Sequence, residues 1–177
     1  MMSYKCLRYC TAVCLLSAVW VAPVKAAFYS DVAVEYLNVK IDGKKLHPWN
    51  GRIKLGKPLS RELAIEAHYA SAIQDDEING LKLEVSENMA AYARYQSPDT
   101  YSGMVMYLIA GYAWTTIETS GAYAIPEQEF ESFSWGIGIE ERAQTVRNMG
   151  YSFQYTRYYD NDGFTLEGFS LGVRYDF

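Results

Sequence analysis

The 177-residue chain has few of the residues from which metal sites and many active sites are built. Its three cysteines all lie within the first 14 residues, and it has two histidines, His47 and His68. Beyond residue 26, no cysteine remains for a disulfide or a thiolate metal ligand. We therefore expect neither a metal site nor a bound cofactor.

Positive charge is also scarce, because 16 Lys and Arg residues face 21 Asp and Glu, which gives a formal net charge of −5. Binding to nucleic acid requires clustered basic residues, so we do not expect a nucleic-acid partner. After residue 26 there is no apolar run long enough for a membrane helix.

The first 26 residues have the features of an export signal. Lys5 and Arg8 precede an apolar stretch over residues 11–24, and a small-x-small pattern ends at Ala26. We predict cleavage after Ala26, with Ala27 or Ala22 as alternatives, and a single domain over residues 27–177. An uncleaved membrane anchor is disfavoured because the apolar stretch is short. Removal of the signal would change the formal charge from −5 to −8.

The final stretch shows the clearest pattern in the chain. Phe169, Leu171, Val173, Tyr175 and Phe177 alternate with small or charged residues. Side chains repeat every two residues along a strand, so this stretch predicts a strand with one bulky apolar face.

Similar alternation divides most of the remaining chain into further strands, giving eight in total. Asp160 to Gly163 reads as a hairpin turn before the last strand, and Glu167-Gly168 is a predicted bulge. The segment 103–117 is apolar on both faces, and we predict that Met104, Met106, Leu108, Ala110, Tyr112 and Trp114 face outward. The eight strands are predicted over residues 28–40, 49–57, 63–72, 81–96, 103–117, 129–141, 149–159 and 164–177.

In the segment 81–96 we predict that Leu81, Leu83 and Val85 share a face with Met89. Between the strands, residues 42–48 are predicted to form a polar loop, and residues 74–80 an acidic loop.

Each predicted strand is long enough to cross a bilayer when it is tilted. One face is bulky and apolar, whereas the other carries Gly, Ser, Ala and single charges, which suits a narrow interior better than a wet surface. We therefore predict an all-β fold, an eight-stranded antiparallel up-and-down transmembrane β-barrel. An even number of strands places both ends of the barrel domain on the same side of the membrane.

Five segments carry a resemblance to a known family: residues 63–69, 92–98, 107–112, 134–140 and 171–177. Their order and spacing resemble the outer-membrane β-barrel domain family, which includes the OmpA-type and OmpX-type barrels. The resemblance implies a monomer in a Gram-negative outer membrane, surrounded by membrane lipid and lipopolysaccharide. It also implies that the assembly machinery reads the terminal strand through Phe169, Leu171, Val173, Tyr175 and Phe177. Unlike full-length OmpA-type proteins, this sequence has no peptidoglycan-binding domain after the barrel, so we expect no wall anchoring by that route.

The predicted facing sends three acids and four bases into the barrel interior: Glu35, Arg52, Lys54, Glu66, Arg94, Glu140 and Arg174. Buried charges are costly unless they are paired, so we predict a network of ion pairs centred on Arg94, Glu66 and Glu140. The resemblance implies a similar plug of charges, with an interior Arg on the seventh strand that Ser152 replaces here. Two interpretations remain: the charges hold the barrel closed, or they gate a low-conductance pore.

An enzyme is not expected. His68 is predicted to face inward beside Glu66, with Ser71 nearby in sequence, but no lipase-like His/Ser/acid spacing is present. A lipid-A-modifying activity is therefore the weakest alternative. His47 is predicted to be a loop residue. Several acids could hold divalent cations against lipopolysaccharide, although a solvated acidic rim explains them more simply: Asp75, Asp76, Glu77, Glu118, Glu127 and Glu129.

Surface binding through the loops, including binding to a host or surface ligand, is a further possibility that the family resemblance raises. Tyr158, Tyr159 and Phe164 could form an apolar contact patch, and an interfacial aromatic girdle explains them equally well. The sequence favours a structural or surface-interaction role.

Overall fold

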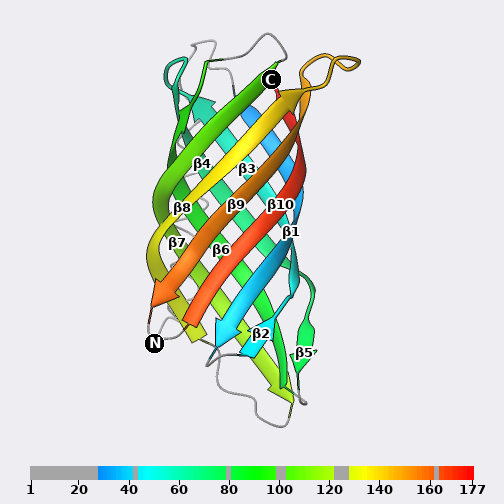
Figure 1. Cartoon of the computed structure of the whole chain (residues 1–177), viewed down its shortest axis with the longest axis vertical. Coiled ribbons are helices and arrows are strands. Elements are labelled where there is room, and N and C mark those ends of the chain that lie inside the picture. Colours follow the sequence, from blue (N-terminus) through cyan, green and yellow to red (C-terminus); the bar gives the residue numbers. More distant parts are fainter. Residues whose placement is uncertain (1–27, 42–43, 79–80, 99–102, 122–127, 162–163) are drawn as a thin grey trace, which may run out of the picture.

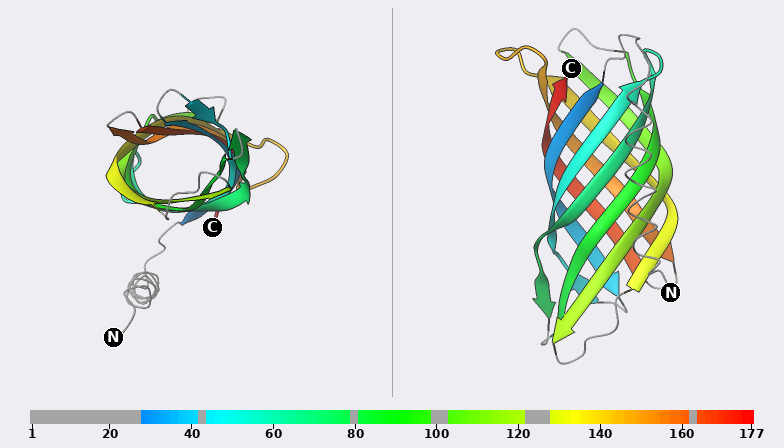
Figure 2. Two further views of the ribbon diagram at one scale, coloured as in Figure 1. Left: turned by 90° about the horizontal axis from the view of Figure 1, so that it is seen from below. Right: turned by 180° about the vertical axis from the view of Figure 1, so that it is seen from behind.

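The chain forms a closed antiparallel β-barrel, as the predicted fold class requires (Figures 1 and 2). The computed structural model describes residues 28–41, 44–78, 81–98, 103–121, 128–161 and 164–177. The predicted signal segment and its cleavage positions, Ala26 and Ala27, lie outside the described residues. Viewed along its axis, the barrel is a complete ring (Figure 2, left).

Eight long strands make the wall, and each neighbours the next along the chain. The ring closes where β1 pairs with β10, from Tyr29 opposite Asp176 to Ile41 opposite Phe164. The strands start and end within four residues of the predicted positions. They are β1 (Tyr29–Ile41), β3 (Trp49–Pro58), β4 (Leu63–Gln74), β6 (Leu81–Gln96), β7 (Met104–Gly121), β8 (Gln128–Arg142), β9 (Met149–Asn161) and β10 (Phe164–Asp176).

Two short strands occupy segments for which the sequence predicted only loops. β2 (Lys44–Leu46) pairs with β1, and β5 (Asp76–Ile78) pairs with β6. These strands extend the wall beyond β3 and β4. The loop prediction was wrong here because three residues are too few to show a clear alternation.

The described chain ends lie at one end of the barrel, where the backbone N–H of Phe177 donates to the carbonyl oxygen of Phe28 over 2.9 Å. We call this the terminal end and the opposite one the far end. Figure 1 places the terminal end at the top, and β5 and the tips of β6 and β7 project at the far end. Among the described residues there is no helix that is long and apolar enough to span a membrane.

The outer face of the wall is apolar over much of its height. Met106 and Leu108 on β7 are 51% and 53% exposed, whereas Tyr107 and Ile109 between them are buried. The predicted facing of this ambiguous segment is confirmed. Its outward side chains continue the apolar surface of β1, where Val32 and Val34 are also exposed.

A β-bulge on β6 reverses the alternation toward the far end. The bulge on β6 lies between Glu84 and Glu87. It corrects the prediction for Leu83 and Val85, which are fully buried and do not share the outward face of Met89. The extra residue on β6 changes which parity faces inward.

The β3–β4 and β9–β10 ladders each also shift register by one residue, at Trp49/Asn50 and at Leu166/Glu167. The sequence predicted a bulge at Glu167-Gly168, and the β9–β10 register does shift at Leu166/Glu167, but the extra residue is Tyr158 on β9. The β10 strand keeps its alternation and its register with β1 through this point, so the predicted position is corrected.

Two tyrosines fill the space that two inward-facing glycines leave. A Cβ added to Gly138 would overlap the Tyr107 ring, and one added to Gly56 would overlap the Tyr29 ring. Each glycine therefore leaves room beside the inner wall for an aromatic ring.

We expect Gly138→Ala to destabilise the barrel by about 1–3 kcal/mol, because the Tyr107 ring must move out of a packed interior. The measurement is urea unfolding in lipid vesicles, followed by tryptophan fluorescence. Gly51→Ala is the matched control, because its new Cβ would meet only the flexible end of Ile73 at 3.2 Å. Equal stability of the two variants would contradict the packing argument.

Candidate functional site

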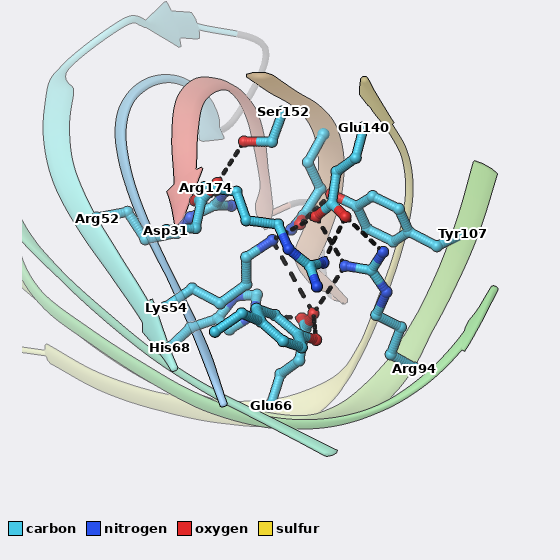
Figure 3. Close-up of polar contacts among 12 residues, drawn as sticks. Asp31, Arg52, Lys54, Glu66, His68, Arg94, Tyr107, Glu140, Ser152 and Arg174 are labelled. Atoms are coloured by element: carbon cyan, nitrogen blue, oxygen red, sulfur yellow. Dashed lines mark hydrogen bonds and ion pairs between the residues drawn. The ribbon is translucent and has the colours of Figure 1, made fainter. Parts of the chain in front are cut away.

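A group of charged side chains occupies the interior near the terminal end. The residues come from five strands and point toward one another (Figure 3). We call them the lumen cluster: Lys54, Glu66, Arg94, Glu140 and Arg174. Their positions follow from the inward parity of β3, β4, β6, β8 and β10, which delivers one long charged side chain from each strand.

Arg94 and Glu140 form the strongest pair of the lumen cluster. The guanidinium donates two hydrogen bonds to the carboxylate, of 2.8 and 2.7 Å. The same guanidinium donates to Glu66 Oε1 over 3.1 Å. Two-point arginine–carboxylate pairs have a fixed geometry and are strong in a buried setting. Arg94 therefore holds the two acids together.

Two further bases share these carboxylates. Arg174 Nη1 donates to Glu140 Oε2 over 2.6 Å, and Lys54 Nζ lies 3.5 Å from Glu140 Oε1 and 4.0 Å from Glu66 Oε1. Lys54, Glu66 and Arg94 are at most 4% exposed. Each charge in this part of the interior thus has partners of opposite sign, as burial requires.

Aromatic rings complete the lumen cluster, and the sequence reasoning missed their role. The Arg94 guanidinium lies 3.8 Å from the Tyr107 ring centroid, and that of Arg174 lies 3.6 Å from the Tyr29 centroid. The Tyr29 hydroxyl donates to Glu66 over 2.6 Å. These contacts add cation–π attraction to the ion pairs. Their role could have been predicted, because both tyrosines have the parity of the inward-facing residues on their strands.

Glu35 and Arg52 form a second group with Asp31. Arg52 lies 3.5 Å from Asp31 and 3.7 Å from Glu35, and all three are at most 1% exposed. The Tyr158 hydroxyl donates to Glu35 over 2.7 Å. Ser152, which stands where the family resemblance implies an Arg, donates to Asp31 instead. The seven predicted residues therefore occupy two groups, and Asp31 is an added member.

An apolar layer fills the interior at the far end. Its residues come from β1, β2, β6, β7 and β10 and are at most 4% exposed. We call it the apolar cap: Leu37, Val39, Leu46, Leu83, Val85, Ile117 and Leu166. On the outside at the same height the wall is polar, because Lys82 and Glu118 lie there. The sequence reasoning missed the cap because the bulge on β6 was not foreseen.

Of the residues weighed for catalysis, His68 is buried and its Nε2 lies 2.8 Å from Glu66 Oε2. Ser71 donates to the backbone oxygen of Ser86, so it does not join His68. His47 is half-buried and stacks on Tyr36, with ring centroids 5.2 Å apart.

Two of the acids considered as a cation rim have partners within the barrel. Asp75 pairs with Lys82, and Asp76 accepts a hydrogen bond from the His47 backbone. Within the described ranges, no group of three His, Cys, Asp or Glu residues could hold a metal ion. Glu127 lies outside these ranges.

The proposed contact patch near the last hairpin requires a correction. Tyr158 is only 1% exposed and points inward, because its position on β9 has the same parity as Ser152 and Gln154. Tyr159 and Phe164 are half-buried and pack with Phe130, with ring centroids 4.8 to 5.4 Å apart. These residues therefore pack against the barrel's own interior.

The terminal strand presents its apolar face outward. The five residues predicted as an assembly signal are between 40% and 72% exposed: Phe169, Leu171, Val173, Tyr175 and Phe177. This places them on the surface that would contact lipid.

Comparison with known proteins agrees with this architecture. Neisserial surface protein A matches with a TM-score of 0.65 and 18% identity, over 86% of this chain and 100% of that one. The attachment invasion locus protein Ail of Yersinia pestis, in complex with the heparin analogue sucrose octasulfate, matches with a TM-score of 0.63 and 14% identity, over 87% and 100%. The N-terminal barrel of Pseudomonas aeruginosa OprF matches with a TM-score of 0.58 and 15% identity, over 83% and 97%. At these identities the likeness shows the fold.

No match was found among curated proteins. The family model for the outer membrane protein beta-barrel domain matches residues 11–177, which is nearly the whole chain. The chain therefore belongs to the outer-membrane β-barrel domain family, whose members reside in the Gram-negative outer membrane.

Proposed function

We propose that this protein is a closed, non-enzymatic barrel of the outer membrane that acts through its outer and exposed surfaces. In this proposal the terminal end faces the periplasm and the far end lies outside the cell. The wall contacts membrane lipid and lipopolysaccharide, and the assembly machinery recognises β10. The role is structural or one of surface interaction.

The observation that carries this proposal is that two different groups of side chains fill the two ends of the interior. The lumen cluster occupies the terminal half with paired charges, and the apolar cap fills the far end with buried aliphatic side chains. Eight-stranded barrels are narrow enough for side chains to fill them. An ion entering from the terminal end would first meet the paired charges, and an ion entering from the far end would first meet the apolar cap.

The alternative is a low-conductance pore gated by the lumen cluster. Such a pore would require the ion pairs to separate and the apolar cap to part at the same time. A dry apolar constriction is itself a barrier to ions. The geometry therefore supports the closed barrel more strongly than the pore.

The surface role draws support from the structural relatives. One of them is a surface protein of Neisseria, and another was crystallised with a heparin analogue. They suggest that a barrel of this shape can present ligand-binding surfaces outside the cell. The chemistry of any ligand has to come from this chain's own residues.

We expect the protein, refolded from residue 27 into planar bilayers, to show no steady current steps under an applied voltage. The paired variant Arg94→Met with Glu140→Leu should also stay silent, because the apolar cap remains in place. Folding is checked by heat-dependent gel mobility. Reproducible openings in the unmodified protein would support the pore, and openings that appear only in the paired variant would show that the cap alone does not seal the lumen.

We expect Glu140→Gln to destabilise the barrel by about 3–5 kcal/mol, because Arg94, Arg174 and Lys54 would lose a shared carboxylate in a buried setting. The free energy of unfolding in urea, measured in lipid vesicles, checks this. Glu141→Gln is the matched control, since Glu141 is the next residue on the same strand and is exposed. A loss below about 1 kcal/mol, the scale of an exposed ion pair, would mean that the charges contribute little to holding the barrel closed.

A further inference from the structure

The backbones of β8 and β9 separate at the far end of the barrel. Their ladder runs from Arg142 opposite Gly150 to Trp135 opposite Arg157 and stops there. Beyond this point β8 continues its pairing with β7, and β9 continues with β10. Two side chains bridge the gap: Ser134 donates to the carbonyl oxygen of Arg157, and Ser132 to that of Tyr158.

The separation leaves a hollow of about 370 Å³ on the outer side of the wall. Its aromatic lining comes from Phe133, Trp135 and Tyr159. Phe133 is 66% exposed and Trp135 is 40% exposed, so both rings are open to a ligand. The Arg157 guanidinium lies 5.9 Å from the Trp135 ring centroid and forms one side of the hollow.

Charged groups surround these rings. Arg157 donates to Asp160 over 2.9 Å and to Glu167 over 2.6 Å. Glu131 and Asp160 line the same hollow and are exposed. Among the residues that line it, the two acids therefore outnumber the single base, and that base is already paired. A phosphate or sulfate would meet net negative charge here.

The hollow lies where the outer face turns from apolar to polar. Trp135, Arg157, Glu167 and Asn38 follow one another across four adjacent strands. Phe133 and Trp135 belong to the aromatic residues that mark membrane interfaces. A ligand in the hollow would thus sit at the level of lipid headgroups in the proposed orientation.

We propose that this hollow binds a saccharide that is neutral or carries amino groups. A sugar ring has an apolar C–H face that can lie against Trp135 or Phe133, and hydroxyls that both donate and accept. Arg157 supplies donors, and Glu131 and Asp160 supply acceptors. Amino groups would be further favoured by the two carboxylates. The sugar can come from a glycolipid headgroup in the outer leaflet or from a soluble glycan.

The test uses the barrel folded in phospholipid nanodiscs and follows the indole N–H signals of its tryptophans by NMR. Adding a soluble tetramer of β-linked glucosamine should shift the Trp135 signal saturably and leave the Trp114 signal unchanged. Trp135→Leu should weaken binding about tenfold, measured by calorimetry. Trp114→Leu is the matched control, because Trp114 is also outward and is 44% exposed.

A second arm replaces part of the phospholipid with a neutral glycosyl diacylglycerol and adds no soluble sugar. A Trp135 shift that anionic phospholipid does not reproduce would identify the glycolipid as the source. A shift with the tetramer alone would identify a soluble glycan. The proposal fails if neither arm moves Trp135, if Trp114→Leu weakens binding as much as Trp135→Leu, or if sucrose octasulfate binds more tightly than the tetramer. Its failure would leave the closed barrel untouched, because conductance does not involve this hollow.

Discussion

The structure depends on the closure of eight strands into a ring, because within hydrocarbon each backbone N–H and C=O must find its partner in the wall. The ladder between β1 and β10 completes that ring over 13 residue pairs. A ring of eight strands is narrow, so its inward side chains have to fill the interior themselves. The interior charges must in turn be paired, since water cannot solvate them there.

Most of the fold could be predicted from the alternation of apolar and polar or small residues along the strands. In β8 and the second half of β10 the bulky apolar residues alternate with small or charged ones, so strand existence, facing and closure could be predicted. The inward parity also collected Arg94, Glu66 and Glu140 in one lumen. Pairing partners could not be predicted, because parity says which side chains enter the interior but not at which height they meet. For this reason Glu35 and Arg52 lie with Asp31, apart from the lumen cluster.

Two features of the far end explain where the predictions from sequence were wrong. The bulge on β6 adds one residue between Glu84 and Glu87, and every residue beyond it on the strand changes face. Nothing in the local composition marks that insertion, since Ser86 and the two acids fit a strand or a turn. β2 and β5 were missed for a related reason, because three residues give too little alternation to read. Both kinds of error fall at the far end, where the chain leaves the regular membrane pattern.

The apolar cap has a consequence for how the barrel reaches its final position. At the far end the inside is aliphatic and the outside carries Lys82 and Glu118, which is the arrangement of a water-soluble protein. Such a piece, once closed, could not pass through hydrocarbon with its charged coat. If the far end lies outside the cell, as proposed, its strands would have to cross the bilayer before they join around Leu83 and Leu166, and sealing of this end would be the last step of assembly.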